Sequence, residues 1–298
     1  MQKVLLFANP IAGRGSALGI GRTLCERLNQ EGFACDFLTD RPEGIDPATL
    51  CDPNLRCIII IGGDGTLRSV ASRMVDHCPP QHWPPLLMVP MGTANLMAQH
   101  LGLRWDKSRL DQQVSDAIRQ LKIIPLDTAK ANDRLFLLMA GVGIDAQIVH
   151  EVDRRRRGPI RKSSYVWPAM QVVGGYDYSP ITVHADGARV FGPIPGVAFI
   201  GNVREYGIGF PMLPHARSDD GVLDLCALPC GSRWQMIKLL AHAAAGEHHQ
   251  LEGSVYLKAR RVEIESDRPM AVQVDGEPAG FTPVRIRMLE HKLRFVVE

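Results

Sequence analysis

Short apolar runs alternate with longer amphipathic stretches in the first part of the chain. The runs are rich in aliphatic residues and have the length of buried strands, at residues 4–8, 34–38, 58–61 and 86–89. The stretches that follow them are expected to be helical, at residues 16–31, 66–78, 94–101 and 111–121. This alternation predicts a parallel sheet with helices on both faces.

The pattern changes near Asp127, where short alternating strands replace the strand-helix repeat. Strands are expected at residues 134–140, 181–185, 197–202, 222–228, 254–259, 262–265 and 270–274. Helices are expected at residues 146–157 and 234–248. In the second helix, the apolar residues expected to face the core are Trp234, Met236, Leu239 and Leu240. The sequence therefore predicts an α/β domain followed by a β-rich domain.

Length and composition are typical of a soluble globular protein. The chain has 298 residues, of which 45% are hydrophobic and 22% charged, and its net charge of +2 selects no class of partner. No apolar run is long enough to span a bilayer, and no signal-peptide flank precedes Val4–Phe7, so we expect a cytoplasmic protein. The seven cysteines lack the spacing of a disulfide framework and are expected to be reduced thiols.

A glycine-rich turn, Gly62–Thr66, follows four consecutive isoleucines. Such a turn brings backbone N–H groups and the start of the next helix toward a phosphate. Asp64 would then meet a phosphate-bound Mg²⁺, directly or through water. One turn of this kind is also typical of an ordinary strand-to-helix connection with an Asp or Thr cap.

Two further loops of the same kind end apolar strands, at Asn9–Ser16 and Pro90–Asn95. Because loops at the carboxyl ends of neighbouring parallel strands converge on one crevice, these loops together favour phosphate binding. Arg14 is placed to reach a phosphate, or is a solvated loop arginine.

Five motifs, in this order, resemble the diacylglycerol-kinase-type lipid kinases, a superfamily that includes sphingosine kinases and, more distantly, NAD kinases and 6-phosphofructokinases. The motifs are Asn9–Gly15, Gly62–Thr66, Pro90–Asn95, Asp219–Asp224 and Val274–Pro278, and the resemblance runs nearly end to end. It implies a three-layer α/β ATP-binding domain, residues 1–127 plus 285–298, to which the last strand returns. It also implies a C-terminal β-sandwich, residues 128–284, with ATP bound in the cleft between the two domains.

The resemblance also implies roles for individual residues. Glu277 matches the family's general base, next to Asp275, and Asp64 and Asp127 match acids of the Mg²⁺ and phosphate network. The candidate nucleotide-binding residues are Asn9, Arg14, Thr39, Gly62, Gly63, Asp64, Gly65, Thr66, Gly92, Thr93 and Asn95.

A structural Mg²⁺ site of some bacterial members matches Asp220 with the carbonyl groups of Arg217 and Val222. From the residues alone, Asp220–Gly221 and Asp275–Gly276 also fit ordinary Asp-Gly turns, the second in a hairpin.

Two departures from the family's pattern remove acids near the expected Mg²⁺ site. The family's Asn-Glu after the Gly62–Thr66 motif is here Arg68–Ser69, following Leu67. The Asp of diacylglycerol-directed members after Gly-Thr-Ala-Asn is here Leu96. Either the chain phosphorylates a different acceptor with a rearranged network, or its activity is low.

A cluster of basic and aromatic residues suits docking on an anionic membrane face. It comprises Arg154–Arg157, Arg161, Lys162, Tyr165–Trp167 and Met170. An ordinary solvated basic run is the alternative. No nucleic-acid reading motif accompanies the cluster, so we expect no nucleic-acid partner.

These observations predict an ATP- and Mg²⁺-dependent kinase that phosphorylates a hydroxyl of a lipid or lipid-like acceptor, in the cytoplasm or peripherally at the inner membrane face. Phosphoryl transfer requires a held γ-phosphate, neutralised charge and an acceptor hydroxyl in line. The alternatives are a soluble-substrate kinase of the NAD-kinase kind and a nucleotide-binding protein with impaired catalysis. The identity of the acceptor stays open, as does the oligomeric state, with a homodimer among the alternatives.

Overall fold

A computed structural model describes residues 2–39, 41–155, 166–206 and 210–298, without the side chains of Arg14 and of residues 166–170. The chain forms two compact units. The first comprises Met1–Leu126 with His291–Glu298, and the second comprises Asp127–Glu290.

The first unit is built on a six-stranded sheet with strand order β2-β1-β3-β4-β17-β5. Its strands are β1 (Gln2–Ala8), β2 (Phe33–Leu38), β3 (Leu55–Gly62), β4 (Leu86–Pro90), β5 (Lys122–Leu126) and β17 (Leu293–Val297). β1 to β4 run parallel, and β17 runs parallel to β4 and antiparallel to β5. All four isoleucines of Ile58–Ile61 are fully buried, because β3 is covered on both faces. The predicted parallel sheet is confirmed for its first four strands.

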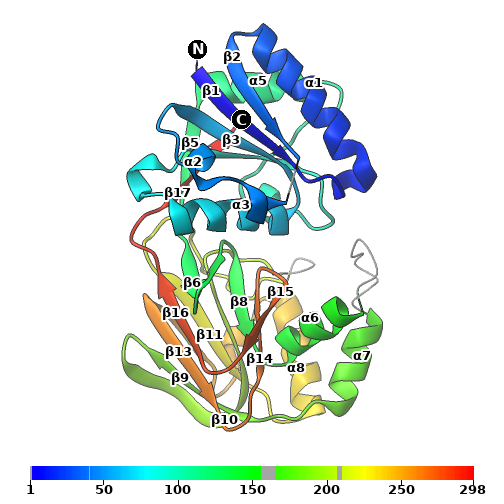
Figure 1. Ribbon diagram of the computed structural model, residues 1–298. Helices are drawn as coiled ribbons and strands as arrows, with labels where there is room; N and C mark the ends of the chain where they lie inside the picture. The colour runs from blue at the N-terminus through cyan, green and yellow to red at the C-terminus, as the bar shows by residue number, and fades with distance from the viewer. Residues whose placement is uncertain (1, 40, 156–165, 207–209) are drawn as a thin grey trace. The chain divides into compact units, whose positions relative to one another are not determined.

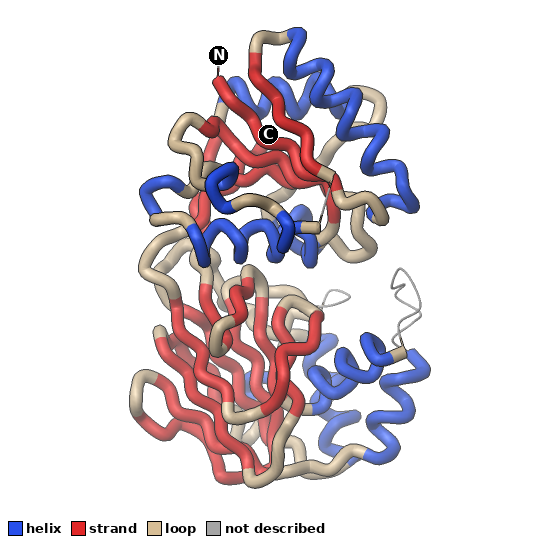
Figure 2. The backbone as a smooth tube through the Cα atoms, in the orientation of Figure 1, coloured by secondary structure: helices blue, strands red, loops and turns tan. Residues whose placement is uncertain are grey.

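Helices flank this sheet (Figure 1), and Figure 2 separates them from the strands by colour. They are α1 (Ser16–Gln30), α2 (Pro47–Leu50), α3 (Asp64–His77), α4 (Leu96–His100) and α5 (Leu110–Gln120), with 3-10 turns η1 (Ala12–Gly15), η2 (Pro42–Gly44) and η3 (Pro80–His82). Leu24 of α1 and Ile118 of α5 share a core with Val4 and Ile59 on one face of the sheet. α4 begins two residues later than predicted, because Asn95 has a left-handed backbone with φ of 52°.

The second unit is an antiparallel, β-sandwich-like domain (Figure 1). Its strands follow the order β15-β14-β8-β10-β9-β13-β16-β6-β7, and β11 pairs with β10 and β12. They are β6 (Ala129–Ala131), β7 (Arg134–Phe136), β8 (Met139–Val142), β9 (Pro180–Ala185), β10 (Ala188–Gly201), β11 (Leu223–Pro229), β12 (Val255–Ala259), β13 (Arg261–Ser266), β14 (Ala271–Val274), β15 (Glu277–Phe281) and β16 (Val284–Met288). The first part of β10 pairs with β9 and its second part with β8 and β11, so this strand links the layers around the core.

The end of the chain divides between the units. Residues 285–290, grouped with the first domain in the sequence prediction, lie in the second unit, because β16 pairs with β13 and β6. Only β17 joins the sheet of the first unit.

Among its described residues, the second unit also contains α6 (Ile144–Arg154), α7 (Val166–Gly175), α8 (Arg233–Ala245) and the 3-10 turn η5 (His248–Gln250). Of the four residues of α8 predicted to lie in the core, two do and two do not. Met236 and Leu239 are buried, whereas Trp234 is 80% exposed and Leu240 48% exposed. The buried stripe runs through Met236, Leu239 and Ala243, which share one face of the helix, and Trp234 and Leu240 fall outside it.

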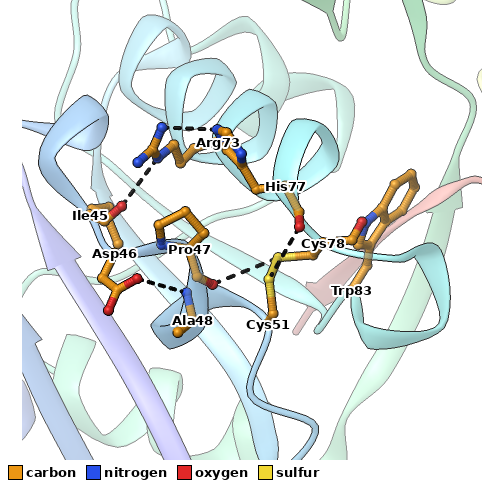
Figure 3. Close-up of a disulfide and its surroundings, with 9 residues drawn as sticks. All are labelled: Ile45, Asp46, Pro47, Ala48, Cys51, Arg73, His77, Cys78 and Trp83. Carbon is orange, nitrogen blue, oxygen red and sulfur yellow. Dashed lines mark hydrogen bonds between the residues drawn. A yellow bond between two sulfur atoms is a disulfide. The ribbon is translucent and has the colours of Figure 1, made fainter.

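A disulfide joins Cys51, which follows α2, to Cys78, which follows α3 (Figure 3). The expectation of reduced thiols was wrong for this pair. The fold brings cysteines 27 positions apart to a Cα–Cα distance of 5.2 Å, which suits a disulfide. The other five, Cys25, Cys35, Cys57, Cys226 and Cys230, are free thiols. The bond fastens α2 to the C-terminal end of α3.

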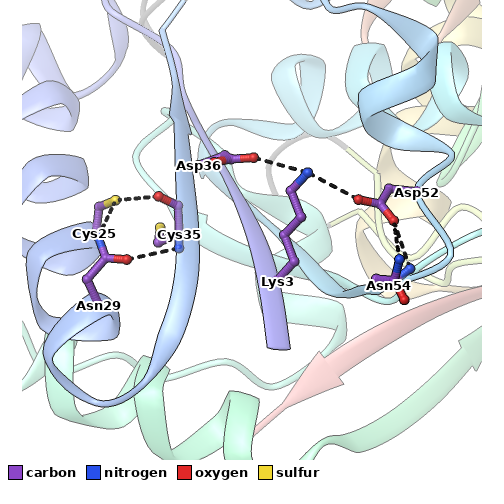
Figure 4. A network of polar contacts seen from close by, with 7 residues as sticks. All are labelled: Lys3, Cys25, Asn29, Cys35, Asp36, Asp52 and Asn54. Carbon is purple, nitrogen blue, oxygen red and sulfur yellow. Dashed lines mark hydrogen bonds and ion pairs between the residues drawn. The ribbon is translucent and has the colours of Figure 1, made fainter. Parts of the chain in front are cut away.

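Lys3 connects three segments near the start of β1 (Figure 4). Its ammonium lies 3.1 Å from the carboxylate of Asp52, before β3, and 3.3 Å from that of Asp36 on β2. The hydrogen bonds to Asp52 and Asp36 raise the pKa of Lys3. This network lies at the amino end of β1, whereas the glycine loops follow the carboxyl ends, so we regard it as structural.

Candidate functional site

Three loops after β1, β3 and β4 meet at the carboxyl end of the sheet in the first unit. The side-chain amide of Asn9 donates to Oγ1 of Thr66 at 2.8 Å. The N–H of Met91 donates to the carbonyl of Gly62 at 2.8 Å, and the N–H of Gly13 donates to the carbonyl of Met91 at 3.2 Å. The loops that the sequence predicted to converge therefore do so.

Gly63 and Gly92 form a close backbone contact between two of these loops. A Cβ on Gly92 would lie 2.7 Å from Cα of Gly63 and 2.7 Å from Oδ1 of Asn95. A Cβ on Gly63 would lie 3.1 Å from Cα of Gly92. Only glycine fits at this contact, and the exposed Gly92 lets a ligand approach the backbone closely.

Gly92→Ala is expected to weaken ATP binding by about tenfold or more, equivalent to about 1.4 kcal/mol, because the new methyl group forces the two loops apart. Calorimetric titration with ATP measures the change. Gly19→Ala is the matched control, since a Cβ on Gly19 of α1 meets nothing within 4 Å. The control should keep its ATP affinity, and equal affinity for Gly92→Ala would contradict the role of this contact.

Asp64 is the first residue of α3 and binds the start of α4. Its Oδ2 accepts a hydrogen bond from the N–H of Leu96 at 2.9 Å, and its Oδ1 accepts one from the N–H of Met97 at 3.0 Å. Burial raises the pKa of Asp64, although these backbone hydrogen bonds act in the opposite direction. Asp64 therefore holds the Pro90–Asn95 loop against α3, a role that the sequence did not reveal.

The remaining candidate nucleotide-binding residues differ in their surroundings. Asn95 closes its loop by accepting from the N–H of Gly92 at 2.8 Å and donating to its carbonyl at 2.9 Å. Gly65 lies in the first turn of α3, and Thr39 and Thr93 are exposed. The side chain of Arg14 lies outside the described residues.

Arg68 places a buried cation where the family pattern has Asn, and Ser69 stands where that pattern has Glu. Arg68 lies in α3, one turn after Asp64, and is only 6% exposed. The N-terminal end of α3, with its partial positive charge, lies at the Gly62–Thr66 turn, which suits an anionic ligand.

In the second unit, Asp275 and Gly276 form the tight turn between β14 and β15, with φ of 49° and 78°. The turn is the Asp-Gly hairpin that the sequence allowed. Glu277 begins β15, and its carboxylate is 38% exposed and lies 3.9 Å from the guanidinium of Arg134. The carboxylate of Glu277 is thus oriented near a cation and open to solvent.

Asp275 has a different environment. Its Oδ2 accepts from the N–H of Leu137 at 2.8 Å, and its Oδ1 accepts from the N–H groups of Leu138 and Met139 at 2.9 and 3.0 Å. These bonds divide the single strand predicted at residues 134–140 into β7 and β8. Three backbone N–H donors therefore hold this carboxylate in one orientation. This arrangement favours a positioning role for Asp275.

Asp127 fastens a loop of the second unit. It is 1% exposed, and its Oδ2 accepts from the N–H of Gly221 at 2.7 Å. Its own N–H donates to the carbonyl of Ser218 at 2.7 Å, and its carbonyl accepts from the amide of Asn202 at 2.6 Å. The Mg²⁺ role implied for Asp127 stays a prediction.

The residues of the implied structural Mg²⁺ site do not fit a divalent cation well. The carboxylate of Asp220 is paired with the ammonium of Lys258, and it also accepts from the N–H of Val222 at 3.3 Å. The nearby Arg217 pairs with Asp219 at 3.6 Å. Within the described ranges, no group of three or more His, Cys, Asp or Glu side chains is arranged to hold a metal.

Asp145 was not singled out in the sequence. It lies in the first turn of α6, and Gln273 donates to its Oδ2 at 3.4 Å and accepts from the N–H of Gly276 at 2.9 Å. Gln273 is fully buried, so it connects Asp145 to the turn that precedes Glu277. Burial raises the pKa of Asp145 to about 7.

This raised pKa predicts a pH-dependent stability. Between about pH 4, near the pKa of an unfolded Asp, and pH 7, the folded state holds a proton that the unfolded state has lost. Stability from this group is therefore present at low pH and lost as the pH rises through 7. The melting temperature of Asp145→Asn, relative to that of the wild type, should therefore increase between pH 5 and pH 8. Thermal unfolding checks this, with Asp153→Asn, an exposed site on α6, as the control. Parallel pH curves for Asp145→Asn and wild type would contradict the prediction.

Most of the basic and aromatic cluster lies outside the described residues, which exclude 156–165 and the side chains of 166–170. Arg154 and Arg155 are described, and both pair with Glu151. Within the part of the chain that is described, no helix has the length and apolarity needed to cross a membrane.

A cavity of about 420 Å³ lies between α6, α7 and the segment before β14. Its lining includes Glu151 and Arg155, which pair with each other, and Asp177 and Arg268, which pair at 2.6 Å. The same lining also includes apolar residues, among them Val172 and Met270.

The α/β unit with glycine-lined loops and the β-sandwich-like unit together define the fold class of NAD kinases and diacylglycerol kinases. Residues 3–131 match the family model for the diacylglycerol kinase catalytic domain. Residues 139–297 match that for the YegS C-terminal NAD kinase beta sandwich-like domain. The chain belongs to the diacylglycerol-kinase-type lipid kinase family.

Relatives and solved structures agree with this assignment. A diacylglycerol kinase of Bacillus subtilis is 25% identical over 290 residues, covering 95% of this chain and 92% of that protein. A Pseudomonas putida protein named "Probable lipid kinase YegS-like" is 27% identical over 232 residues, covering 77% of this chain and 73% of that protein.

Among solved structures, a diacylglycerol kinase from Bacillus anthracis has a TM-score of 0.73 at 22% identity, covering 100% of this chain and 97% of that chain. An NAD kinase from Archaeoglobus fulgidus in complex with ATP has a TM-score of 0.54 at 13% identity, covering 99% of this chain and 93% of that chain. These two similarities concern the fold.

Proposed function

We propose that this chain is a kinase that uses ATP and Mg²⁺ to phosphorylate an alcohol hydroxyl of a lipid or lipid-like acceptor. The observation that carries the proposal is the contact between Gly63 and Gly92, with Asp64 beside it, in a chain of this family. Relatives named diacylglycerol kinase support a lipid acceptor.

The first unit binds the triphosphate of ATP. The phosphates approach the backbone of the Gly62–Thr66 turn and the Pro90–Asn95 loop, where side chains are absent at the closest contact. The N-terminal end of α3 offsets part of their negative charge.

Asp64 fits a water-mediated contact with Mg²⁺. Its two oxygens accept the N–H groups of Leu96 and Met97, and a carboxylate has enough lone pairs to accept from a metal-bound water as well. When bound, the ion neutralises charge on the phosphates.

Glu277 takes the proton of the acceptor hydroxyl. Its carboxylate is 38% exposed, and the guanidinium of Arg134 lies 3.9 Å away. Asp275, held by three backbone N–H groups, positions the turn.

A second candidate function is nucleotide binding with impaired catalysis. It is favoured by Ser69, which stands where typical members have Glu, and by Leu96, which stands where diacylglycerol-directed members have Asp.

Transfer of radiolabelled phosphate from ATP to extracted lipids, or to NAD, tests these functions. The lipid-kinase proposal expects labelled lipid with the wild type and none with Glu277→Gln or Asp64→Ala. Labelling of NAD alone would identify a soluble-substrate kinase. Tight ATP binding without any transfer would identify the impaired form.

A further inference from the structure

Helix α8 presents two apolar faces. Its N-terminus is capped by Ser232, whose hydroxyl accepts from the N–H of Gln235, and it ends at Gly246 in the left-handed conformation. Met236, Leu239 and Ala243 lie on the buried face. This face alone accounts for the attachment of the helix to the second unit.

The second apolar face is open to solvent. Trp234 is 80% exposed, Ile237 54% and Leu240 48%. At about 3.6 residues per turn, these side chains form a slanted row that starts opposite the buried stripe at Trp234 and ends beside it at Leu240. Half of the six large hydrophobic side chains that are exposed in the described residues therefore lie on this one helix. Such clustering marks an interaction surface.

The charged side chains of α8 itself are all basic. Arg233 and Lys238 are exposed on α8, and no Asp or Glu occurs in the sequence between Asp224 and Glu247. Arg233 also donates a hydrogen bond to the carbonyl of Gly174 at the end of α7, so it is anchored to the fold. An apolar stripe bordered by cations complements a surface that is apolar inside and anionic outside.

We propose that the face formed by Trp234, Ile237 and Leu240, with Arg233 and Lys238, docks on a lipid bilayer that carries anionic headgroups. Helices of this composition lie in the interface plane, and tryptophan is favoured at headgroup level. A second copy of the chain fits less well, since it would oppose the same cations without an acid on the helix to compensate them. The inference rests on the proposed function, because it supplies the surface from which a lipid acceptor would be taken.

Vesicle flotation tests the docking directly, without ATP. Wild-type protein should float with phosphatidylcholine vesicles that contain phosphatidylglycerol, and the triple variant Trp234→Gln, Ile237→Gln, Leu240→Gln should bind at least about tenfold more weakly. Lys238→Gln should weaken binding only to the phosphatidylglycerol vesicles. The matched controls are Ile194→Gln, at a side chain 40% exposed, and Arg285→Gln, at one 80% exposed, and both should float like wild type.

An activity comparison separates this inference from the proposed function. The triple variant should keep the wild-type kcat on a water-dispersed short-chain diacylglycerol and show a raised KM for diacylglycerol in vesicles. Absence of any lipid phosphorylation by wild type would contradict the proposed function. Flotation would still test whether the α8 face docks on the bilayer. Unchanged flotation of the triple variant would overturn the inference. The inference would also be overturned if light scattering showed that the wild type is a dimer and the triple variant is a monomer.

Discussion

Asp64→Asn is expected to lower kcat about 10²- to 10³-fold, the size of effect seen when one preorganised charge-stabilising group is removed. The asparagine keeps one oxygen acceptor for the N–H groups of Leu96 and Met97, but its NH₂ group faces the other donor. It also removes the negative charge proposed to hold Mg²⁺ through water. Turnover with a lipid acceptor, measured across a range of Mg²⁺ concentrations, reports both consequences.

A matched control lies on the same helix. Asp76→Asn makes the same chemical change near the C-terminal end of α3, where the exposed Asp76 accepts from Ser72 at 3.0 Å. This variant should keep the turnover and the Mg²⁺ dependence of the wild type. Near-normal turnover of Asp64→Asn would show that Asp64 only caps α4.

Glu277→Gln is expected to lower kcat by about 10²- to 10⁴-fold, the range attributed to a general base, with ATP affinity unchanged. The amide has nearly the same shape and cannot accept the hydroxyl proton at neutral pH. Steady-state kinetics and ATP titration measure the two quantities. Glu263→Gln is the control, because Glu263 is also an exposed acid of the second unit that lies 3.8 Å from an arginine, Arg285.

Asp275→Asn distinguishes the positioning role of Asp275 from the catalytic role proposed for Glu277. Because Asp275 accepts from three backbone N–H groups, its loss should lower the free energy of unfolding by about 1.5–3 kcal/mol. Glu277→Gln should leave the melting temperature nearly unchanged. A normal kcat for Glu277→Gln, together with a lost kcat for Asp275→Asn at full stability, would reverse the assignment of the base.

Much of the α/β unit could be predicted because its signals are local. Ile58–Ile61 is too apolar for a surface strand, and the glycines that follow it permit a turn that other residues resist. The convergence of three loops then followed from the general geometry of parallel sheets. Five motifs in order also indicated the family and the β-sandwich-like second unit.

Other features depend on contacts between residues distant in sequence. The carboxylate of Asp64 caps a helix that begins 32 residues later, and the Cys51–Cys78 bond requires α2 and α3 to be adjacent. The exposure of Trp234 escaped prediction because an apolar stripe on each side of α8 gives no single amphipathic direction. Lys258, as the partner of Asp220, is likewise brought there only by the pairing of β11 and β12.

A crystal structure with Mg²⁺ and a non-hydrolysable ATP analogue would test the central claim most directly, which is that the loops around Gly63 and Gly92 bind a triphosphate. The account predicts phosphate density against the backbone of Gly62–Thr66 and Pro90–Asn95, with a metal-bound water at Asp64. Density for the triphosphate at any other place on the chain would contradict it.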